Sequence, residues 1–160
     1  MPSPLEQPGV VQAIYIAPAA RATMTAVEYV LAVAERGLEG DRYFFGEGTF
    51  SRWPGTGRNV TLIEAEAIEA ARAQTGIDLP DGRSRRNIVT AGVRLAELNG
   101  RRFRIGEAVL RGTRECAPCK HLERLTEPGV EDAFKGRGGL RAEILQDGII
   151  RVGDFIEPVP

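Results

Sequence analysis

Apolar and polar residues alternate along several short stretches of this chain, and glycine, proline or aspartate separates many of them. Alternation with a period of two places every second side chain on one face, as in a half-buried strand. Arg102 and Arg104, for example, alternate with Phe103 and Ile105. The pattern predicts strands over residues 10–16, 26–33, 58–63, 86–90, 102–105, 108–113, 140–145, 149–152 and 155–158.

Only a few segments have the composition of a helix. The stretch 64–74 is rich in alanine and glutamate and predicts a helix that ends near Gly76. Pro118 favours the first turn of a short helix over 118–125, and another short helix is expected over 130–135. The stretch 26–33 could form either element. A strand is favoured because two sets of positions alternate there: Val27, Tyr29 and Leu31 with Glu28, Val30 and Ala32.

The remaining segments predict turns and loops. Residues 1–8 contain three prolines and are expected to be extended or loose. The glycine-rich stretch 37–57 predicts a long loop, and loops of that length are usually functional or disordered. Asn99 and Gly100 predict a hairpin turn over 98–101, because both residue types accept positive φ angles.

Many short strands, few helices and no regular β-α-β alternation predict a mainly β fold with short helices (α+β), built as a barrel or sandwich. The 160 residues suit one domain over residues 1–160, with a core over about 10–157. No apolar run reaches the ~20 residues that span a bilayer, and the N-terminus lacks the pattern of a secretory signal. We expect a cytoplasmic protein without membrane contact.

The strongest candidate for chemistry is the motif Cys116-Ala117-Pro118-Cys119-Lys120-His121, at the expected junction of a strand and a helix. A helix N-terminus carries about half a positive charge, which favours a thiolate. A thiol with a pKa near 8.5 is about 3% ionised at pH 7, whereas a pKa near 6 gives about 90%. One arginine ~4 Å away contributes up to about 4 kcal/mol at an effective dielectric of ~20. We therefore expect Cys119 to be a reactive thiolate.

Cys116 and His121 leave several interpretations open. The two cysteines could be small buried residues at a helix start, and His121 could donate a proton near the thiolate or simply lie on the helix. Zinc would need a carboxylate as well, because Cys116, Cys119 and His121 supply only three ligands. A dithiol oxidoreductase, in which Cys116 attacks and Cys119 resolves, is the alternative function. The absence of an upstream β-α-β unit argues against that alternative.

Arginine outnumbers lysine, nineteen to two, and nine arginines lie between Arg83 and Arg114. Genome composition and solvated strand faces can explain such an excess. A nucleic-acid-binding barrel would use these arginines, but Phe103 is the only aromatic residue there for base stacking, so we expect no nucleic-acid partner. Glycine beside arginine suits an anionic, phosphate-bearing ligand instead. The candidate positions are Gly40, Asp41, Arg42, Arg86, Asn87, Arg137, Gly138, Gly139 and Arg141.

The sequence resembles the MOSC domain family. The resemblance is carried by Gly37-Leu38-Glu39-Gly40-Asp41-Arg42-Tyr43, Arg58-Asn59-Val60-Thr61-Leu62-Ile63-Glu64, Arg86-Asn87-Ile88-Val89-Thr90, Leu98-Asn99-Gly100, Ile105-Gly106, Cys119 with its preceding proline, Arg137-Gly138-Gly139 and Val152-Gly153-Asp154. These motifs occur in the family's order over roughly residues 10–157.

The resemblance implies a mostly antiparallel β-barrel and a key cysteine at Cys119. In relatives this cysteine is thought to carry sulfur as a persulfide or to ligate molybdenum of a bound pterin cofactor, and some relatives reduce N-hydroxylated substrates. The glycine- and arginine-rich positions, Arg58 included, would hold the anionic cofactor, which we expect to be lost on purification. The chain is too short for a pyridoxal-phosphate domain of its own, so a cysteine desulfurase or a molybdoenzyme is the partner that the resemblance implies.

Overall fold

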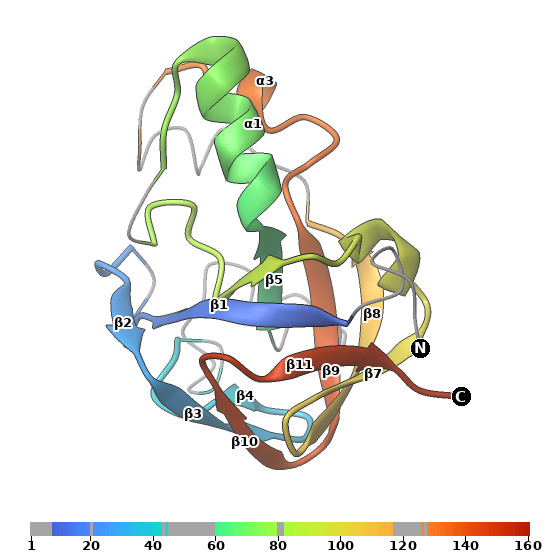
Figure 1. Ribbon diagram of the computed structural model, residues 1–160. Helices are drawn as coiled ribbons and strands as arrows, with labels where there is room; N and C mark the ends of the chain where they lie inside the picture. The colour runs from blue at the N-terminus through green and yellow to red at the C-terminus, as the bar shows by residue number, and fades with distance from the viewer. Residues whose placement is uncertain are drawn as a thin grey trace.

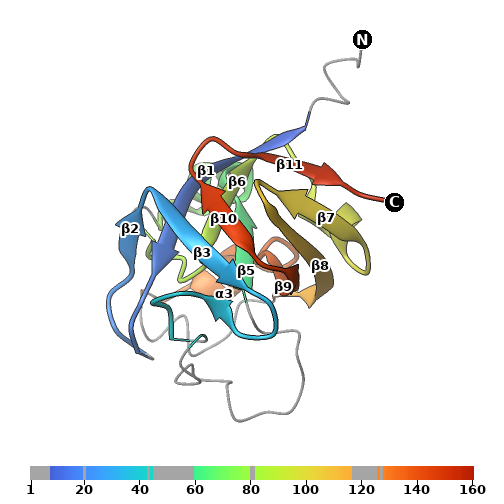
Figure 2. The ribbon, with the colours of Figure 1, turned by 90° about the horizontal axis from the view of Figure 1, so that it is seen from below.

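The computed structural model describes residues 8–19, 21–42, 44, 60–79, 82–116, 126 and 128–160 of the chain. Within these residues the strands form a closed barrel, with a small sheet at one end and helix α1 (Ala65–Thr75) projecting at the other (Figure 1). Figure 2 shows the same molecule from the end that carries the small sheet. None of the described helices has both the length and the apolar composition needed to cross a bilayer.

The barrel closes because the last strand of the chain pairs with the first. Gly9 pairs with Ile156 and Val10 with Phe155. Around the barrel the order is β1 (Gly9–Ile16), β11 (Phe155–Pro158), β7 (Arg102–Ile105), β8 (Ala108–Glu115), β9 (Leu140–Gln146), β5 (Val60–Glu64) and β6 (Ile88–Ala91). Among these described strands, neighbours are antiparallel except for one parallel pair, β5 with β6. A short strand, β2 (Thr25–Val27), extends the sheet along the C-terminal end of β1.

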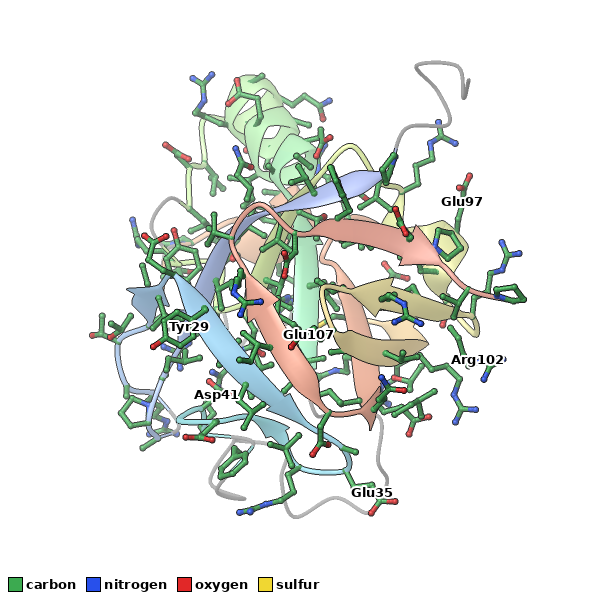
Figure 3. All side chains as sticks on the ribbon, turned by 60° about the horizontal axis from the view of Figure 1, so that its bottom comes forward. Tyr29, Glu35, Asp41, Glu97, Arg102 and Glu107 are labelled. Atoms are coloured by element: carbon green, nitrogen blue, oxygen red, sulfur yellow. The ribbon has the colours of Figure 1, made fainter. Side chains whose placement is uncertain are left out.

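A three-stranded sheet covers one open end of the barrel. It consists of β10 (Gly148–Arg151), β3 (Tyr29–Val33) and β4 (Gly37–Leu38). Because side chains alternate across a strand, Val30 and Ile150 point into the barrel core while Tyr29 points outward. Figure 3 shows Tyr29 on this outer face, where 66% of its surface is exposed.

Two apolar clusters stabilise the fold. The main cluster fills the barrel with side chains such as Leu62, Phe103 and Leu110. The second lies outside the barrel, where α1 and the short helix α3 (Val130–Ala133) cover β5 and β6. Strand β5 is therefore buried on both faces, with Leu62 inside the barrel and Ile63 in the cluster with α1. Each fully buried Leu or Ile contributes roughly 1.5–3 kcal/mol.

Every strand expected within the described residues is present, with small shifts of its ends. The stretch 26–33 is extended, but it breaks at Glu28 into β2 and β3. The long loop predicted from residue 37 is wrong at its start, because Gly37 and Leu38 pair with β3 as β4. The predicted helix 118–125, residues 1–7 and Arg58 lie outside the described residues.

A turn forms over 98–101, where the Arg101 N–H donates to the Leu98 carbonyl at 3.1 Å, but the prediction that this turn joins two strands of a hairpin is wrong. Residues Leu95–Leu98 form a 3-10 helix, η2, so no strand precedes the turn. Asn99 has a φ of −65°, and only Gly100 takes a positive φ, of 76°. The turn instead docks η2 on β8, since Gly100 donates its N–H to the carbonyl of Gly112 at 2.8 Å. Contact with β8 therefore takes the place of the pairing between two adjacent strands that an Asn-Gly turn usually indicates.

Candidate functional site

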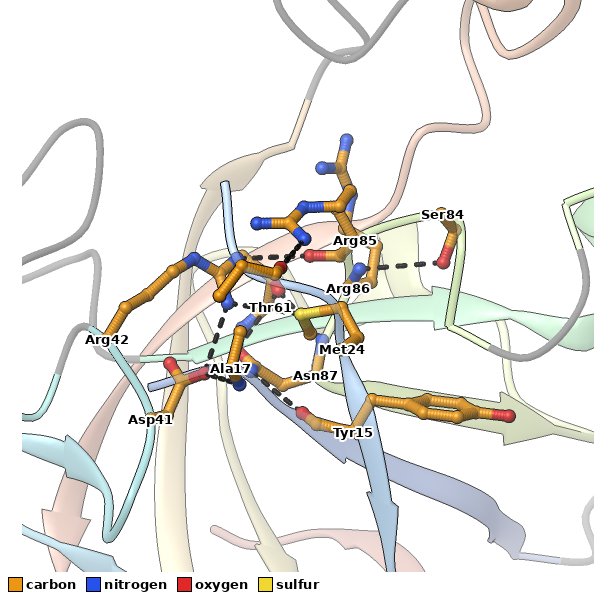
Figure 4. A network of polar contacts seen from close by, with 11 residues as sticks. Tyr15, Ala17, Met24, Asp41, Arg42, Thr61, Ser84, Arg85, Arg86 and Asn87 are labelled. Carbon is orange, nitrogen blue, oxygen red and sulfur yellow. Dashed lines mark hydrogen bonds and ion pairs between the residues drawn. The ribbon is translucent and has the colours of Figure 1, made fainter. Parts of the chain in front are cut away.

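Asp41 and Arg42 form a buried ion pair beside the end of β1 (Figure 4). One carboxylate oxygen of Asp41, Oδ1, accepts hydrogen bonds from the Ala17 N–H and from Arg42 Nη1, both at 3.0 Å. Arg42 Nη2 also donates to the carbonyl of Arg85 at 3.2 Å. Gly40, with a φ of 88°, makes the preceding turn. The predicted Gly40-Asp41-Arg42 cluster thus links the end of β1 to the chain just before β6.

Asn87 fixes the start of β6 to two other strands. Its side-chain oxygen accepts from the Thr61 N–H at 3.1 Å, and its own N–H donates to the Thr61 hydroxyl at 3.0 Å. Its side-chain nitrogen donates to the carbonyl of Tyr15 at 3.1 Å. Asn87 is fully buried. The backbone of Arg85 and Arg86, immediately before it, is therefore attached to β1 and β5.

Arg86 joins two segments that are far apart in the sequence. Its Nε donates to the carbonyl of Gly138 at 2.8 Å and its Nη2 to the carbonyl of Cys116 at 3.1 Å. The Cys116 N–H in turn donates to the carbonyl of Gly139 at 2.8 Å. Cys116 is fully buried and Arg86 is 8% exposed. The structure thus brings the predicted residues Cys116, Arg86, Gly138 and Gly139 together at the end of β8.

Arg137 borders a separate cavity. It donates from Nε to the carbonyl of Ala133 at 2.8 Å, and with Gly139 it lines a cavity of about 220 Å³. Arg141 lies on β9 opposite Thr61 of β5, the residue that Asn87 contacts, and its carbonyl accepts from the Thr113 hydroxyl at 3.1 Å. The structure therefore places Arg141 beside the strand that Asn87 holds, and Arg137 at a different cavity.

Glu64 and Glu115 supply carboxylates to the 220 Å³ cavity. Burial raises the pKa of Glu64 above its ordinary value of 4.5, and the hydrogen bond that its Oε2 accepts from the Leu95 N–H at 3.2 Å opposes part of that rise. In the part of the chain that the structure describes, no group of three His, Cys, Asp or Glu side chains is placed to hold a metal ion.

A second cavity, of about 240 Å³, is lined by three arginines. Arg21 and Arg85 both have positive φ angles, 68° and 65°, which are strained for residues with a side chain. A guanidinium nitrogen of Arg85 donates to the carbonyl of Ala22, which joins the two segments that form the cavity wall. This arrangement can bind an anion such as phosphate or carboxylate. The lining residues are Arg21, Thr23, Met24, Gly82, Arg83, Arg85 and Thr126.

Sequence reasoning missed Arg21 and Arg85 as site candidates. The predicted motif drew attention to Arg86, but the neighbouring Arg85 lines the cavity while Arg86 is buried against backbone carbonyls. No local pattern marks Arg21, because it joins the cavity only through folding. Cys119 and His121 lie outside the described residues. The described residues that flank them are Cys116, held by Arg86, and Thr126, on the wall of the arginine cavity.

A sequence model of the MOSC domain family matches residues 35–157, more than half of the chain. No curated protein matches the sequence.

Solved structures share the fold at low sequence identity. YuaD from Bacillus subtilis has a TM-score of 0.78 and 18% identity, with 95% of this chain and 96% of that chain covered. YiiM from Geobacillus stearothermophilus has a TM-score of 0.70 and 16% identity, covering 96% of this chain and 76% of that one. YiiM from Escherichia coli has a TM-score of 0.68 and 18% identity, covering 96% and 69%.

Proposed function

Because the chain belongs to the MOSC domain family, we propose that it binds the molybdenum cofactor and that Cys119 carries sulfur as a persulfide or ligates the molybdenum. The family is associated with this cofactor, which is an anionic, phosphate-bearing pterin. The proposal therefore requires two features of this chain: a cationic site for the anion and a thiol that ionises near neutral pH.

The arginine-lined cavity is the observation that carries the proposal. Three guanidinium groups, from Arg21, Arg83 and Arg85, surround about 240 Å³. Guanidinium forms paired, charge-assisted hydrogen bonds with phosphate oxygens, and strained backbone is common where a ligand is held. The volume is slightly below the ~300–1,000 Å³ of typical small-molecule sites, so it suits the phosphate end of a larger ligand. The donor set fits the cofactor's charge.

Cys119 is the proposed reactive thiol. It follows Cys116 by three residues, and three residues of extended chain span at most ~11 Å. Cys116 lies against the Arg86 guanidinium, and the same chain segment leads to Thr126 on the arginine cavity. Positive charge at both ends of the segment favours a thiolate within it. A thiolate is the form required both for sulfur carriage and for molybdenum ligation.

The burial of Cys116 argues against the alternative function, a dithiol oxidoreductase that uses Cys116 and Cys119. Thioredoxin-like chemistry needs the first cysteine of the pair to attack, and attack requires access to solvent or substrate. Cys116 has no exposed surface, and its N–H and carbonyl are both held by other segments. The burial therefore favours Cys119 as the reactive residue. Through these backbone hydrogen bonds, Cys116 fixes the start of the segment that contains Cys119.

In the proposed site Arg21, Arg83 and Arg85 hold the anionic end of the cofactor, Cys119 supplies the sulfur ligand or carries the sulfur, and His121 donates a proton nearby. When bound, the molybdenum centre supplies two-electron redox chemistry, as in the reduction of an N-hydroxylated substrate, or receives sulfur. A cysteine desulfurase or a molybdoenzyme is the proposed protein partner. The chain itself supplies the arginines that bind the cofactor and the thiol of Cys119.

Metal analysis and intact mass spectrometry test the proposal. The full chain is purified gently from a host that makes the molybdenum cofactor and, as a control, from a host that lacks it. We expect molybdenum and a pterin only in the first preparation, or a mass increase of one sulfur atom that disappears in Cys119→Ser. Arg83→Ala should lower the retained molybdenum about tenfold, the loss of about 1.4 kcal/mol of binding, while the exposed Arg101→Ala should not. Absence of both molybdenum and persulfide in repeated gentle preparations, together with no rebinding of molybdenum cofactor added to the purified chain, contradicts the proposal.

A further inference from the structure

The register of three strands places two carboxylates at one mouth of the barrel, the mouth beside α1 (Figure 1). Leu140 of β9 lies opposite Leu62 of β5 and opposite Glu115 of β8. Residues directly opposite each other in a sheet project from the same face, and so do residues two apart along one strand. Glu64, two residues after Leu62, therefore projects from the same face as Glu115 and Leu140. These three side chains line the 220 Å³ cavity.

Arg137 supplies the opposite charge to the same cavity. Its Nε donates to the carbonyl of Ala133 at 2.8 Å, and its backbone N–H donates to the carbonyl of Phe134 at 2.9 Å. Both the guanidinium and the backbone are therefore anchored beside α3. Within the described chain, neither Nη1 nor Nη2 of Arg137 donates to a protein group. Two donors on one rigid planar group are thus available to a ligand.

The two carboxylates are not paired with this arginine. Among the described residues, no oxygen of Glu64 or Glu115 lies within 4.0 Å of an Arg137 nitrogen. Glu64 accepts the Leu95 N–H through Oε2, and in this part of the chain no hydrogen bond reaches its Oε1 or the Glu115 carboxylate. Charges of both signs therefore line one cavity without neutralising each other. A ligand that carries both an anionic and a cationic group can contact both.

We propose that this cavity binds a small zwitterion, an amino acid with an aliphatic side chain. Arg137 binds the ligand carboxylate through paired, charge-assisted hydrogen bonds, and Glu64 and Glu115 bind its ammonium group. Leu95 and Leu140, both 2% exposed, supply an apolar wall for the aliphatic side chain. The volume holds roughly seven water-sized groups at ~30 Å³ each, which suits an amino acid as small as valine.

The amino acid site is separate from the proposed cofactor site. The arginine-lined cavity shares no described lining residue with it. Binding of an amino acid therefore requires neither the molybdenum cofactor nor Cys119, and it can be measured on the full chain with or without the cofactor.

Titrations with three closely related ligands test the assignment. L-Valine carries both charges, isobutylamine lacks the carboxylate and isovalerate lacks the ammonium group. The full chain, labelled with a nitrogen isotope, is titrated with each ligand and followed by NMR, because the amide signals of Leu95, Gly136 and Gly139 report on the cavity wall. We expect saturable shifts of these signals with L-valine, and about tenfold weaker binding of isobutylamine and of isovalerate.

Variants identify the group of the ligand that each residue holds. In Arg137→Gln, L-valine should bind about tenfold more weakly, and removal of the ligand carboxylate should then make no further difference. Glu115→Gln should weaken L-valine about fivefold and leave the binding of isovalerate undiminished. Arg101→Gln and Glu157→Gln, at exposed positions outside the cavity lining, are the matched controls. Thermal unfolding establishes that each variant is folded; if Arg137→Gln is not, the wild-type ligand series and Glu115→Gln decide.

Three results would overturn the amino acid site. The first is the absence of saturable shifts with L-valine up to about 10 mM. The second is equal binding of L-valine and one of the singly charged ligands, which would indicate a simple cation site for isobutylamine or a simple anion site for isovalerate. The third is unchanged binding of L-valine by a folded Arg137→Gln or Glu115→Gln variant.

Discussion

Arginine side chains have two roles in this protein, and the extent of their burial distinguishes the two roles. Arg42 and Arg86 are 5% and 8% exposed, and their guanidinium groups bond to Asp41 and to backbone carbonyls. A buried charge must be paired and hydrogen-bonded, or its desolvation costs several kcal/mol. Arg21 and Arg83 are exposed at the cavity and can exchange water for an anion. The same residue type therefore stabilises the fold in one place and is available for binding in another.

Gly139 is the residue whose substitution should be most damaging at the candidate site. Its φ is 112°, which costs about 1–2 kcal/mol with a side chain, and an added Cβ would also overlap the carbonyl oxygen of Leu62. We expect Gly139→Ala to lower the free energy of unfolding by about 3 kcal/mol or more, because overpacking adds to the strain. Urea denaturation followed by circular dichroism measures the change.

The matched control is Gly153→Ala. Gly153 also has a positive φ, 95°, but no atom outside its immediate neighbours would lie within 4 Å of an added Cβ. Gly153→Ala should therefore lower the free energy of unfolding through backbone strain alone, by about 1–2 kcal/mol. Equal losses in the two variants would mean that the close approach of Gly139 to β5 does not contribute.

The junction of β5 and α1 is the element that most clearly links the core to a polar site. Strand β5 is buried on both faces, and its last residue, Glu64, immediately precedes α1. The carboxylate of Glu64 accepts the Leu95 N–H and so connects the junction to η2. One strand therefore fixes the barrel wall, the helix start and the edge of the 220 Å³ cavity.

The raised pKa of Glu64 predicts a pH effect on stability. The folded state favours the protonated carboxyl, because burial disfavours its charge. The stability gained from this preference is fully present below the unfolded pKa of about 4.5 and is lost as pH rises through the raised folded pKa. Glu64→Gln keeps the acceptor for Leu95 but does not titrate. We expect the variant to become more stable relative to the wild type as the pH rises above about 4.5 and through the raised pKa of the folded state.

Urea unfolding of both proteins at several pH values and constant ionic strength tests this expectation. A difference in unfolding free energy that stays constant over the range, or that moves in the wild type's favour as pH rises, would show that Glu64 does not titrate as its burial indicates.

At the scale of the whole molecule, closure of the barrel depends on the two ends of the chain. Strand β11 pairs with β1 at Gly9–Ile156 and Val10–Phe155, and with β7 along its other edge. Ile156 is 1% exposed and belongs to the main core. Pairing of residues so distant in sequence carries a large loop-closure cost before it is repaid by contacts, so we infer that closure comes late in folding.

Deletion of residues 155–160 should therefore abolish cooperative folding. The deletion exposes an edge on both β1 and β7 and removes Ile156, whose burial contributes roughly 1.5–3 kcal/mol. Calorimetry should show no sharp transition, whereas deletion of Pro160 alone should leave one. A truncated chain that unfolds with the wild-type midpoint would show that the barrel does not need β11.

Most strands, helix α1 and the mainly β class follow from the sequence alone, although β4 and the break between β2 and β3 do not. The family motifs directed attention to Arg86, Asn87 and Gly139. These features are readable because alternation, helix composition and turn residues act over a few neighbouring positions. The η2 helix was missed, and Asn99 was misassigned to a hairpin, because the turn over 98–101 packs against β8 instead of joining two strands.

Contacts between segments far apart in the chain set which arginines are buried and which line a cavity. Arg21 and Arg85 are separated by 63 intervening residues and share a wall because β1 and β6 pair side by side in the barrel. Arg86 is buried because carbonyls from Gly138 and Cys116 fold onto it. The partners of a charged side chain come from distant parts of the chain, so no pattern among its sequence neighbours can specify them.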